Sequence, residues 1–256
     1  MTLTVDIGNT NIAFGLWDQG AWVDHWRLQS STEKTTDEYR VLFETLLQGG
    51  GQQPEHYHRI VLSSVVPALT PAIAAVARRL NGRDPLIVSH RLRTGLNPDH
   101  EIPAELGSDL LANAVAVWGR YGRGAIAVDF GTALTFTAVS DDGRILGVSI
   151  APGLRGAVGA LSTNTAQLPA VELVPPPSAL ARTTVHSIQS GVVYGYVGLV
   201  REVCGRMADE MAGTPLIVAT GGLAETFAPV AGSFDAVDQW LTLDGLRRLS
   251  ELNPAD

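Results

Sequence analysis

Two stretches of the chain place an aspartate and a glycine at the end of a strand-like segment. The first reads Val5-Asp6-Ile7-Gly8-Asn9, and the pattern returns 123 residues later as Val128-Asp129-Phe130-Gly131-Thr132. Glycine lets the backbone of a tight turn approach a ligand with its N–H groups pointing outward. A carboxylate would repel phosphate unless a cation lay between them, so the two aspartates indicate metal-bridged phosphate binding.

The alternative interpretation of each stretch is an ordinary turn, because Asp-x-Gly is common between strands. One copy alone would favour the ordinary turn. Two copies in the same strand–turn–strand setting favour a nucleotide site that holds a polyphosphate from both sides. The chain contains no G-x-x-x-x-G-K-[ST] motif, so a P-loop is not predicted.

Segments rich in β-branched and aromatic residues surround both stretches and predict the strands that must position them. The predicted strands are residues 2–6, 12–17, 22–28, 59–65, 85–89, 125–129, 134–139, 144–150 and 216–219. Periodicity predicts helices at residues 36–47, 71–80, 105–121, 153–161, 185–211 and 243–252. The repeated antiparallel meander indicates a duplicated α/β chain with a cleft between domains 1–120 and 121–256. The last helix, residues 243–252, follows the second domain in the sequence but can pack against the first domain.

Composition narrows the class of protein. The chain has 256 residues, of which 45% are apolar and 17% charged, a profile typical of a packed globular protein. A net charge of −8 disfavours nucleic acid or an anionic membrane as a partner. Cys204 is the single cysteine, which excludes an intramolecular disulfide. The N-terminus lacks the basic region of a signal peptide, so we expect a cytoplasmic protein.

Asp109 is a candidate general base near the start of the predicted helix 105–121. A kinase needs a carboxylate that accepts a proton from the attacking hydroxyl, because the rest of phosphoryl transfer is positioning and charge stabilisation. The structural alternative is that Ser108 caps this helix and Asp109 complements its dipole. Considered without any relative, these residues favour the structural alternative.

A set of motifs in the right order resembles a known family. The motifs are Asp6-Ile7-Gly8-Asn9-Thr10, Thr36-Asp37-Glu38-Tyr39, Leu106-Gly107-Ser108-Asp109, Asp129-Phe130-Gly131-Thr132, Pro152-Gly153, Gln189-Ser190-Gly191, Thr220-Gly221-Gly222 and Leu241-Thr242-Leu243-Asp244-Gly245-Leu246. Together they resemble the type III pantothenate kinases of the actin-like ATPase and sugar-kinase superfamily. The resemblance implies duplicated actin-like (ribonuclease-H-like) domains and a homodimer with active sites at the interface. It also implies ATP-dependent phosphorylation of pantothenate to 4'-phosphopantothenate, the first step of coenzyme A biosynthesis, with Mg²⁺ and a monovalent cation, K⁺ or NH₄⁺.

The resemblance also implies roles for individual residues. Asp109 is the expected catalytic base, Asp129 the ligand of the monovalent cation, and Asp6 the residue that faces Mg²⁺. The residues expected to bind ATP are Asp6, Ile7, Gly8, Asn9, Thr10, Asn11, Ile12, Ala13 and Thr132. The residues expected to bind pantothenate are His100, Gly107, Ser108, Asp109, Leu110 and Thr184. Thr184 is also expected to cap the helix that starts at Val185, a structural role that is compatible with substrate binding.

Two positions depart from the family pattern. The family usually has arginine where this chain has Leu110, and tyrosine where it has His100. Loss of a guanidinium removes a bidentate anchor for a carboxylate. These departures motivate an alternative function, a non-catalytic regulatory homologue of the same fold. A third hypothesis is an actin-like ATPase or phosphatase without a pantothenate pocket.

Overall fold

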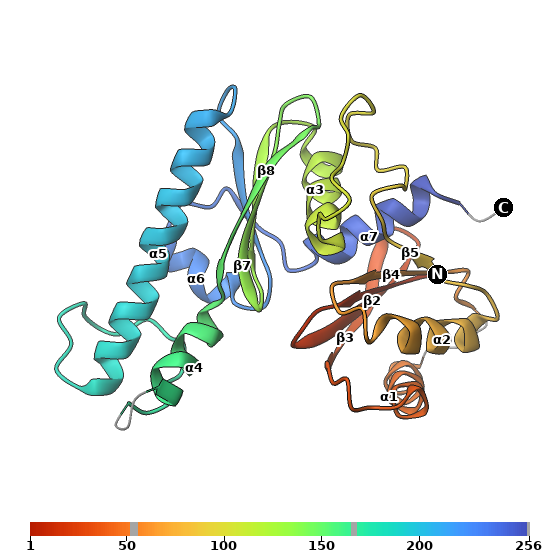
Figure 1. Ribbon diagram of the computed structural model, residues 1–256, viewed down its shortest axis with the longest axis horizontal. Coiled ribbons are helices and arrows are strands. Elements are labelled where there is room, and N and C mark those ends of the chain that lie inside the picture. Colours follow the sequence, from red (N-terminus) through yellow and green to blue (C-terminus); the bar gives the residue numbers. More distant parts are fainter. Residues whose placement is uncertain (52–55, 165–167, 255–256) are drawn as a thin grey trace. The chain divides into compact units, whose positions relative to one another are not determined.

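The computed structural model describes residues 1–51, 56–164 and 168–254 (Figure 1). The chain forms two compact units. The first comprises residues 1–119 together with 241–256, and the second comprises residues 120–240. No helix in the described ranges is long and apolar enough to cross a membrane.

The first unit is built on a five-stranded sheet in the order β3-β2-β1-β4-β5. Its strands are β1 (Thr2–Ile7), β2 (Asn11–Asp18), β3 (Ala21–Gln29), β4 (Arg59–Ser64) and β5 (Leu86–Ile87). Its helices are α1 (Thr36–Gly49), α2 (Thr70–Asn81), α3 (Ser108–Tyr121), of which the last two residues fall in the second unit, and α7 (Leu241–Leu252). Strand β1 pairs antiparallel with β2 and parallel with β4, so β1 and β4 end at the same edge of the sheet.

The second unit repeats this plan. Its sheet has the order β10-β9-β6-β7-β8, with β6 antiparallel to β7 and parallel to β9. The strands are β6 (Ala125–Phe130), β7 (Ala133–Val139), β8 (Ile145–Pro152), β9 (Leu216–Thr220) and β10 (Ala236–Val237). The helices are α4 (Leu154–Asn164), α5 (Thr184–Glu210) and α6 (Ala224–Ala231).

The two sheets have the same strand order and the same strand directions, with β1 and β6 at corresponding central positions. In each unit the aspartate therefore lies near the end of the first strand, and the glycine directly follows that strand. The duplicated α/β architecture expected from the sequence echo is confirmed, and it places Asp6 and Asp129 at equivalent points of the two sheets.

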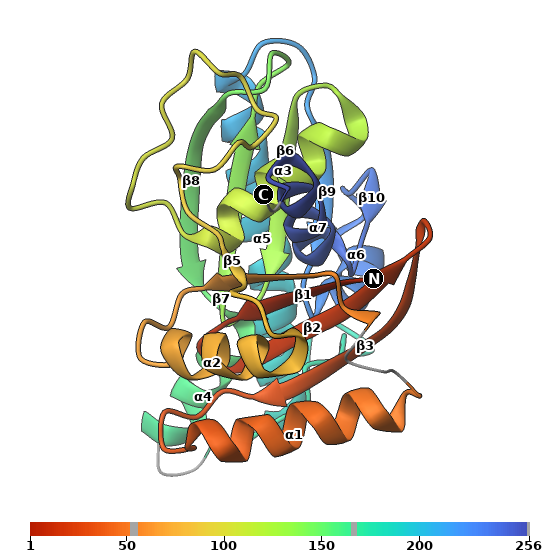
Figure 2. The ribbon, with the colours of Figure 1, turned by 90° about the vertical axis from the view of Figure 1, so that its right-hand side faces the viewer.

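Alternation along β1 divides the first sheet into two faces. Leu3, Val5 and Ile7 join the core formed with α1 and α2, so Thr4 and Asp6 point to the opposite face. Figure 2 shows α1 and α2 on one side of this sheet and α7 on the other. Helix α7 packs on β1 and β4, which leaves the face of Asp6 covered by helical structure.

Helix α7 is held against α3 by close packing and by a hydrogen bond from Arg248, whose side chain also pairs with Asp244 within α7. A side chain at Gly245 would collide with the carbonyl oxygen of Ala112, so only glycine allows the two helices to approach this closely. Burial by itself raises the pKa of Asp244, but hydrogen bonds from Arg248 and Arg247, with their positive charges, outweigh burial and lower it. Arg248 also donates to the carbonyl oxygen of Gly119 (2.8 Å), the point at which α3 nears its end.

The structure corrects several predicted boundaries. Helix α3 begins at Ser108 and not at residue 105, because Leu106 closes a turn by donating its N–H to Pro103 O (3.1 Å). Helix α6 was missed because it is short and contains Pro229, a residue that normally ends helices. Strand β10 was missed because it has two residues, too few for a periodic signal.

Candidate active site

The first Asp-x-Gly stretch forms a tight turn whose polar tip is exposed. Gly8 N–H donates to Asn11 O (3.0 Å), and Ser30 at the end of β3 donates through its hydroxyl to Gly8 O (2.5 Å). Asn9, Thr10 and Asn11 are exposed at this tip. The flanking Ile7 and Ile12 are fully buried, so their side chains serve the core, and only their backbone is available to a ligand.

Asp6 and the start of α3 meet at the edge where β1 and β4 end. Asp6 is paired with Ser63 in the parallel register of these two strands, and Ser63 Oγ lies 2.9 Å from Ser108 Oγ. Ser108 Oγ also accepts from Ser64 N–H (2.9 Å) and donates to Ser64 O (3.1 Å). Two carboxylates that are 103 positions apart in the sequence, Asp6 and Asp109, are thus brought to one edge of the sheet.

Asp109 is half-buried in the first turn of α3. Desolvation raises the pKa of its carboxyl above the ordinary aspartate value, although the N–H of Leu110 donates to Oδ1 (2.8 Å) and partly offsets this. A Cβ at Gly107 would lie 2.5 Å from the same oxygen, so the glycine leaves room for the carboxylate. A desolvated carboxylate with a raised pKa is a stronger base than an exposed one.

The second Asp-x-Gly stretch collects three motifs around Asp129. In the sheet register Asp129 is paired with Thr135 on β7 and with Thr220 on β9. A side chain at Gly221, where φ is +90°, would collide with Asp129 Oδ1. A side chain at Gly153 would collide with the carbonyl oxygen of Thr132. Glycine therefore lets the segment at Gly221 approach the Asp129 carboxylate, and it lets the segment at Gly153 approach the backbone of the turn after β6.

Comparison with known proteins agrees with this geometry. The family model for type III pantothenate kinase matches residues 2–206. A type III pantothenate kinase from Anaeromyxobacter sp. (strain Fw109-5) is 45% identical over 253 residues, covering 99% of this chain and 100% of the relative. One from Myxococcus xanthus is 41% identical over 255 residues, covering 100% of both. The chain belongs to the type III pantothenate kinase family.

Solved structures with low sequence identity share the fold of this pantothenate kinase family member. The ethanolamine utilization protein EutJ from Carboxydothermus hydrogenoformans has a TM-score of 0.58 at 17% identity, covering 97% of this chain and 89% of that one. The activator of 2-hydroxyisocaproyl-CoA dehydratase from Clostridium difficile, solved with bound ADPNP, has a TM-score of 0.56 at 16% identity, covering 97% and 92%. They support the actin-like fold class.

The two departures from the pantothenate kinase pattern have different surroundings. Leu110 is only 6% exposed, so its side chain belongs to the protein interior. His100 is half-buried in a turn closed by its own N–H to Asn97 O (3.2 Å). Among the described residues, neither side chain forms a polar contact with Asp109. That Leu110 and His100 contact the substrate remains a prediction.

Thr184 is not the cap of helix α5. The cap is Thr183, whose hydroxyl accepts the N–H of His186 (3.2 Å), and Thr184 is the first helical residue. The predicted capping role of Thr184 is therefore wrong, because Thr183 performs it. The Thr184 side chain is exposed and available to a ligand.

The two aspartates fit cations that are shared with a phosphate ligand. Within the described part of the chain, no group of three or more His, Cys, Asp or Glu residues could hold a metal ion by itself. Mg²⁺ is commonly held by one or two carboxylates together with substrate phosphates and water. Asp6, a single carboxylate beside a glycine turn, fits that donor set, and Asp129 likewise offers one carboxylate to a cation and not a closed protein cage.

Sequence reasoning missed Ser30, which bonds to the turn after Asp6, and Ser63, which lies beside Asp6 on β4. Ser63 is completely buried at the end of β4, and Ser30 holds the carbonyl of Gly8. The available signal was a small polar residue at the end of an apolar strand, a position where the chain changes direction and backbone groups need partners.

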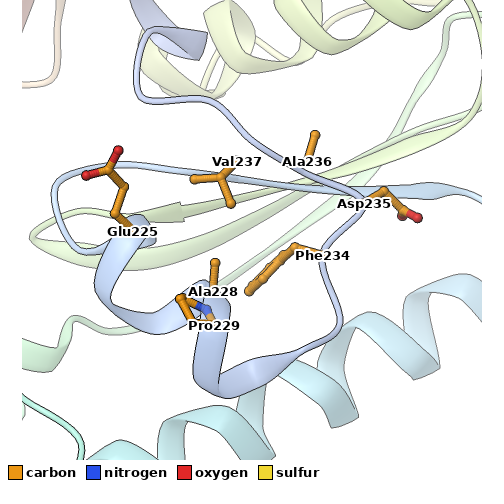
Figure 3. Close-up of a pocket in the computed structure, with 7 residues that line it drawn as sticks. All are labelled: Glu225, Ala228, Pro229, Phe234, Asp235, Ala236 and Val237. Atoms are coloured by element: carbon orange, nitrogen blue, oxygen red, sulfur yellow. The ribbon is translucent and has the colours of Figure 1, made fainter.

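A shallow pocket of about 470 Å³ lies in the second unit between α6 and β10 (Figure 3). Ala228, Pro229 and Phe234 form its apolar side, and Glu225 and Asp235 stand at its rim. Asp235 already accepts the N–H of Ile217 (2.7 Å), and Glu225 accepts a hydrogen bond from Gln239. None of the site residues predicted from the sequence lines this pocket.

Proposed function

We propose that this protein transfers the γ-phosphoryl group of ATP to the primary hydroxyl of pantothenate, giving 4'-phosphopantothenate for coenzyme A biosynthesis. The observation that carries the proposal is the relationship to type III pantothenate kinases, at 41–45% identity over at least 99% of this chain. The location of Asp6 and Asp109 at one sheet edge supports it, because phosphoryl transfer needs a phosphate-binding turn beside a base.

Asp109 acts as the base in this proposal. Its carboxylate accepts the proton of the attacking hydroxyl as the oxygen bonds to the γ-phosphorus and the bond to the β-phosphate oxygen breaks. Because burial raises its pKa, the carboxylate has a greater affinity for that proton than an exposed aspartate has. The exposed Thr184 is assigned to hold the substrate's polar groups.

In this proposal the turn around Gly8 in the first unit and the glycine turn around Asp129 in the second unit are each assigned a role in phosphate binding. Outward N–H groups at the exposed tip would donate to phosphate oxygens, with Thr132 adding a hydroxyl. Asp6 is assigned to Mg²⁺ and Asp129 to K⁺ or NH₄⁺. When bound, these cations neutralise phosphate charge that would otherwise be repelled by the carboxylates. The requirement for ATP fits a location in the cytoplasm.

Measurement of ATP turnover with and without pantothenate tests this function. We expect ADP release that depends on pantothenate, with one phosphopantothenate formed for each ADP. Turnover without pantothenate would instead indicate an actin-like ATPase. Nucleotide binding without turnover under either condition would indicate the non-catalytic homologue.

Leu110→Arg tests whether the departure at this position weakens substrate binding. We expect the KM for pantothenate to fall about ten-fold with little change in kcat, since a carboxylate anchor binds ground and transition states alike. We also expect a lower Tm, because the position is 6% exposed and a buried guanidinium is costly. Leu110→Met, an apolar change of similar volume, should leave both values near those of the parent. A folded arginine variant with an unchanged KM would contradict the substrate role of position 110.

We further propose that the active protein is a homodimer. Edge strand β8 carries an exposed apolar row, with Leu146 at 49%, Val148 at 40% and Ile150 at 64% exposure. This row points away from the core of its own unit, since Gly147, Ser149 and Ala151 pair with the core-facing residues of β7. An apolar row on an unpaired edge favours association with another chain.

Ile150→Asp should convert the dimer into a monomer in sedimentation experiments at micromolar concentration, because it places a charge in the apolar row. Activity should be lost with the dimer if the sites lie at the interface. Val23→Asp is the matched control, since Val23 is 47% exposed on β3, the corresponding edge strand of the first unit. A fully active monomeric parent would refute the shared-site proposal.

A further inference from the structure

We propose that Ser63 is a positioning residue for phosphoryl transfer, which holds the start of α3, with Asp109, against the strand end that carries Asp6. The proposal rests on the kinase function proposed above. Ser63 touches neither the substrate nor the reacting atoms in this proposal and acts through Ser108.

Ser63 lies between the two carboxylate-bearing elements. It is 0% exposed, and its partner in the parallel register is Asp6. Paired residues of adjacent strands point to the same face of a sheet, so the Ser63 hydroxyl lies on the face to which Asp6 points. Its oxygen is 2.9 Å from Ser108 Oγ, one residue before Asp109.

The direction of this hydrogen bond follows from the partners of Ser108. A serine hydroxyl has one proton and two acceptor lone pairs. Ser108 gives its proton to Ser64 O (3.1 Å) and accepts from Ser64 N–H (2.9 Å). Its remaining lone pair accepts from Ser63, which is therefore the donor. With all three bonds made, the hydroxyl of Ser108 is saturated.

The third bond supplies an orientation that the other two cannot. Both bonds to Ser64 end on the backbone of one residue, and two contact points leave rotation about the line that joins them. The bond from Ser63 adds a third point, on the residue beside Asp6. The packing of α7 holds the body of α3, while the bond from Ser63 fixes the orientation of its first residue and, one position on, the Asp109 carboxylate. Misplacement of a catalytic group by about 1 Å can cost on the order of 10²-fold in rate.

Ser63→Ala tests the proposal because it removes one oxygen and creates no overlap. We expect kcat to fall roughly ten-fold, the rate equivalent of one lost hydrogen bond, with the KM for ATP nearly unchanged. Thr4→Val is the matched control. Thr4 is also fully buried on this face of the sheet, but its hydroxyl donates to Gly15 O (3.2 Å) on β2 and not to α3. We expect Thr4→Val to keep the kcat of the parent even if its Tm falls as much as that of Ser63→Ala.

A measurement on the free protein, without substrate, tests the positioning role of Ser63 independently of the proposed kinase function. The Asp109 carboxyl can be titrated by carbon NMR in the free protein, where burial raises its pKa. Ser63→Ala should move that pKa towards the ordinary aspartate value as the carboxylate becomes more exposed, and Thr4→Val should not. An equal kcat loss in the two variants, or an unshifted Asp109 titration in Ser63→Ala, would overturn the positioning role. A parent without pantothenate-dependent turnover would refute the proposed function, while the titration would still decide the role of Ser63.

Discussion

Asp109→Asn should lower kcat by about 10²–10⁴-fold, the usual contribution of a positioned acid or base, while ATP binding is largely kept. The substitution keeps the shape of the side chain, and its amide oxygen can still accept the N–H of Leu110. The loss would therefore report the missing base and not a disrupted helix start. Rapid-mixing kinetics with saturating substrates measures kcat directly.

The pH dependence gives a second signature of the same carboxyl. The base must be ionised, so the rate of the parent should rise with pH through the raised pKa of Asp109, above the range of an exposed aspartate. Folding favours the protonated form. The contribution of this carboxyl to stability is therefore complete below its unfolded pKa and is lost as the pH rises through its folded pKa. At neutral pH the asparagine variant should melt no lower than the parent.

Asp37→Asn is the matched control for the structural alternative. Asp37 lies in the first turn of α1, so its loss also removes a negative charge from a helix N-terminus. If Asp109 only complements the dipole of α3, the two variants should behave alike in activity; their stabilities are not compared, because Asp37 also forms ion pairs with Arg40 and Arg79. Intact turnover in Asp109→Asn would mean that another group accepts the proton.

Replacement of Asp129, the proposed cation ligand, should cause the second largest loss of activity. Asp129→Ala should reduce kcat/KM by roughly 10²-fold or more, since uncompensated phosphate charge costs several kcal/mol in the transition state. The parent should be active in potassium or ammonium buffer and nearly inactive in sodium alone. The comparison requires the same ionic strength in all buffers, because screening also alters phosphate binding.

Asp142→Ala is the control for general charge removal from the second unit. Asp142 lies in the turn between β7 and β8, where it accepts a hydrogen bond from Ser140 (2.5 Å). This variant should keep both its activity and its preference for potassium. Equal rates of the parent in sodium and potassium would remove the cation role from Asp129, whatever the activity of the alanine variant.

Local pattern in the sequence was sufficient for most individual elements. Strands β1, β2 and β6 were predicted within about two residues, because β-branched residues and Gly or Asp turns mark strands and their ends. The repeated Asp-x-Gly pattern further indicated the duplication, which the matching strand orders of the two sheets confirm. Short elements escaped prediction, since α6 and β10 offer too few residues for a periodic signal.

The meeting of the site residues was decided by tertiary structure alone. Asp6, Ser63 and Ser108 come from three separate elements, and the register of β1 against β4 brings them together. That register depends on which side chains of α1, α2 and α7 pack on the two sheet faces. A one-residue slip would turn Asp6 towards the apolar core. The sequence alone determined which residues could do the chemistry, whereas long-range packing determined which of them share one edge, because contacts between distant segments are not encoded in local periodicity.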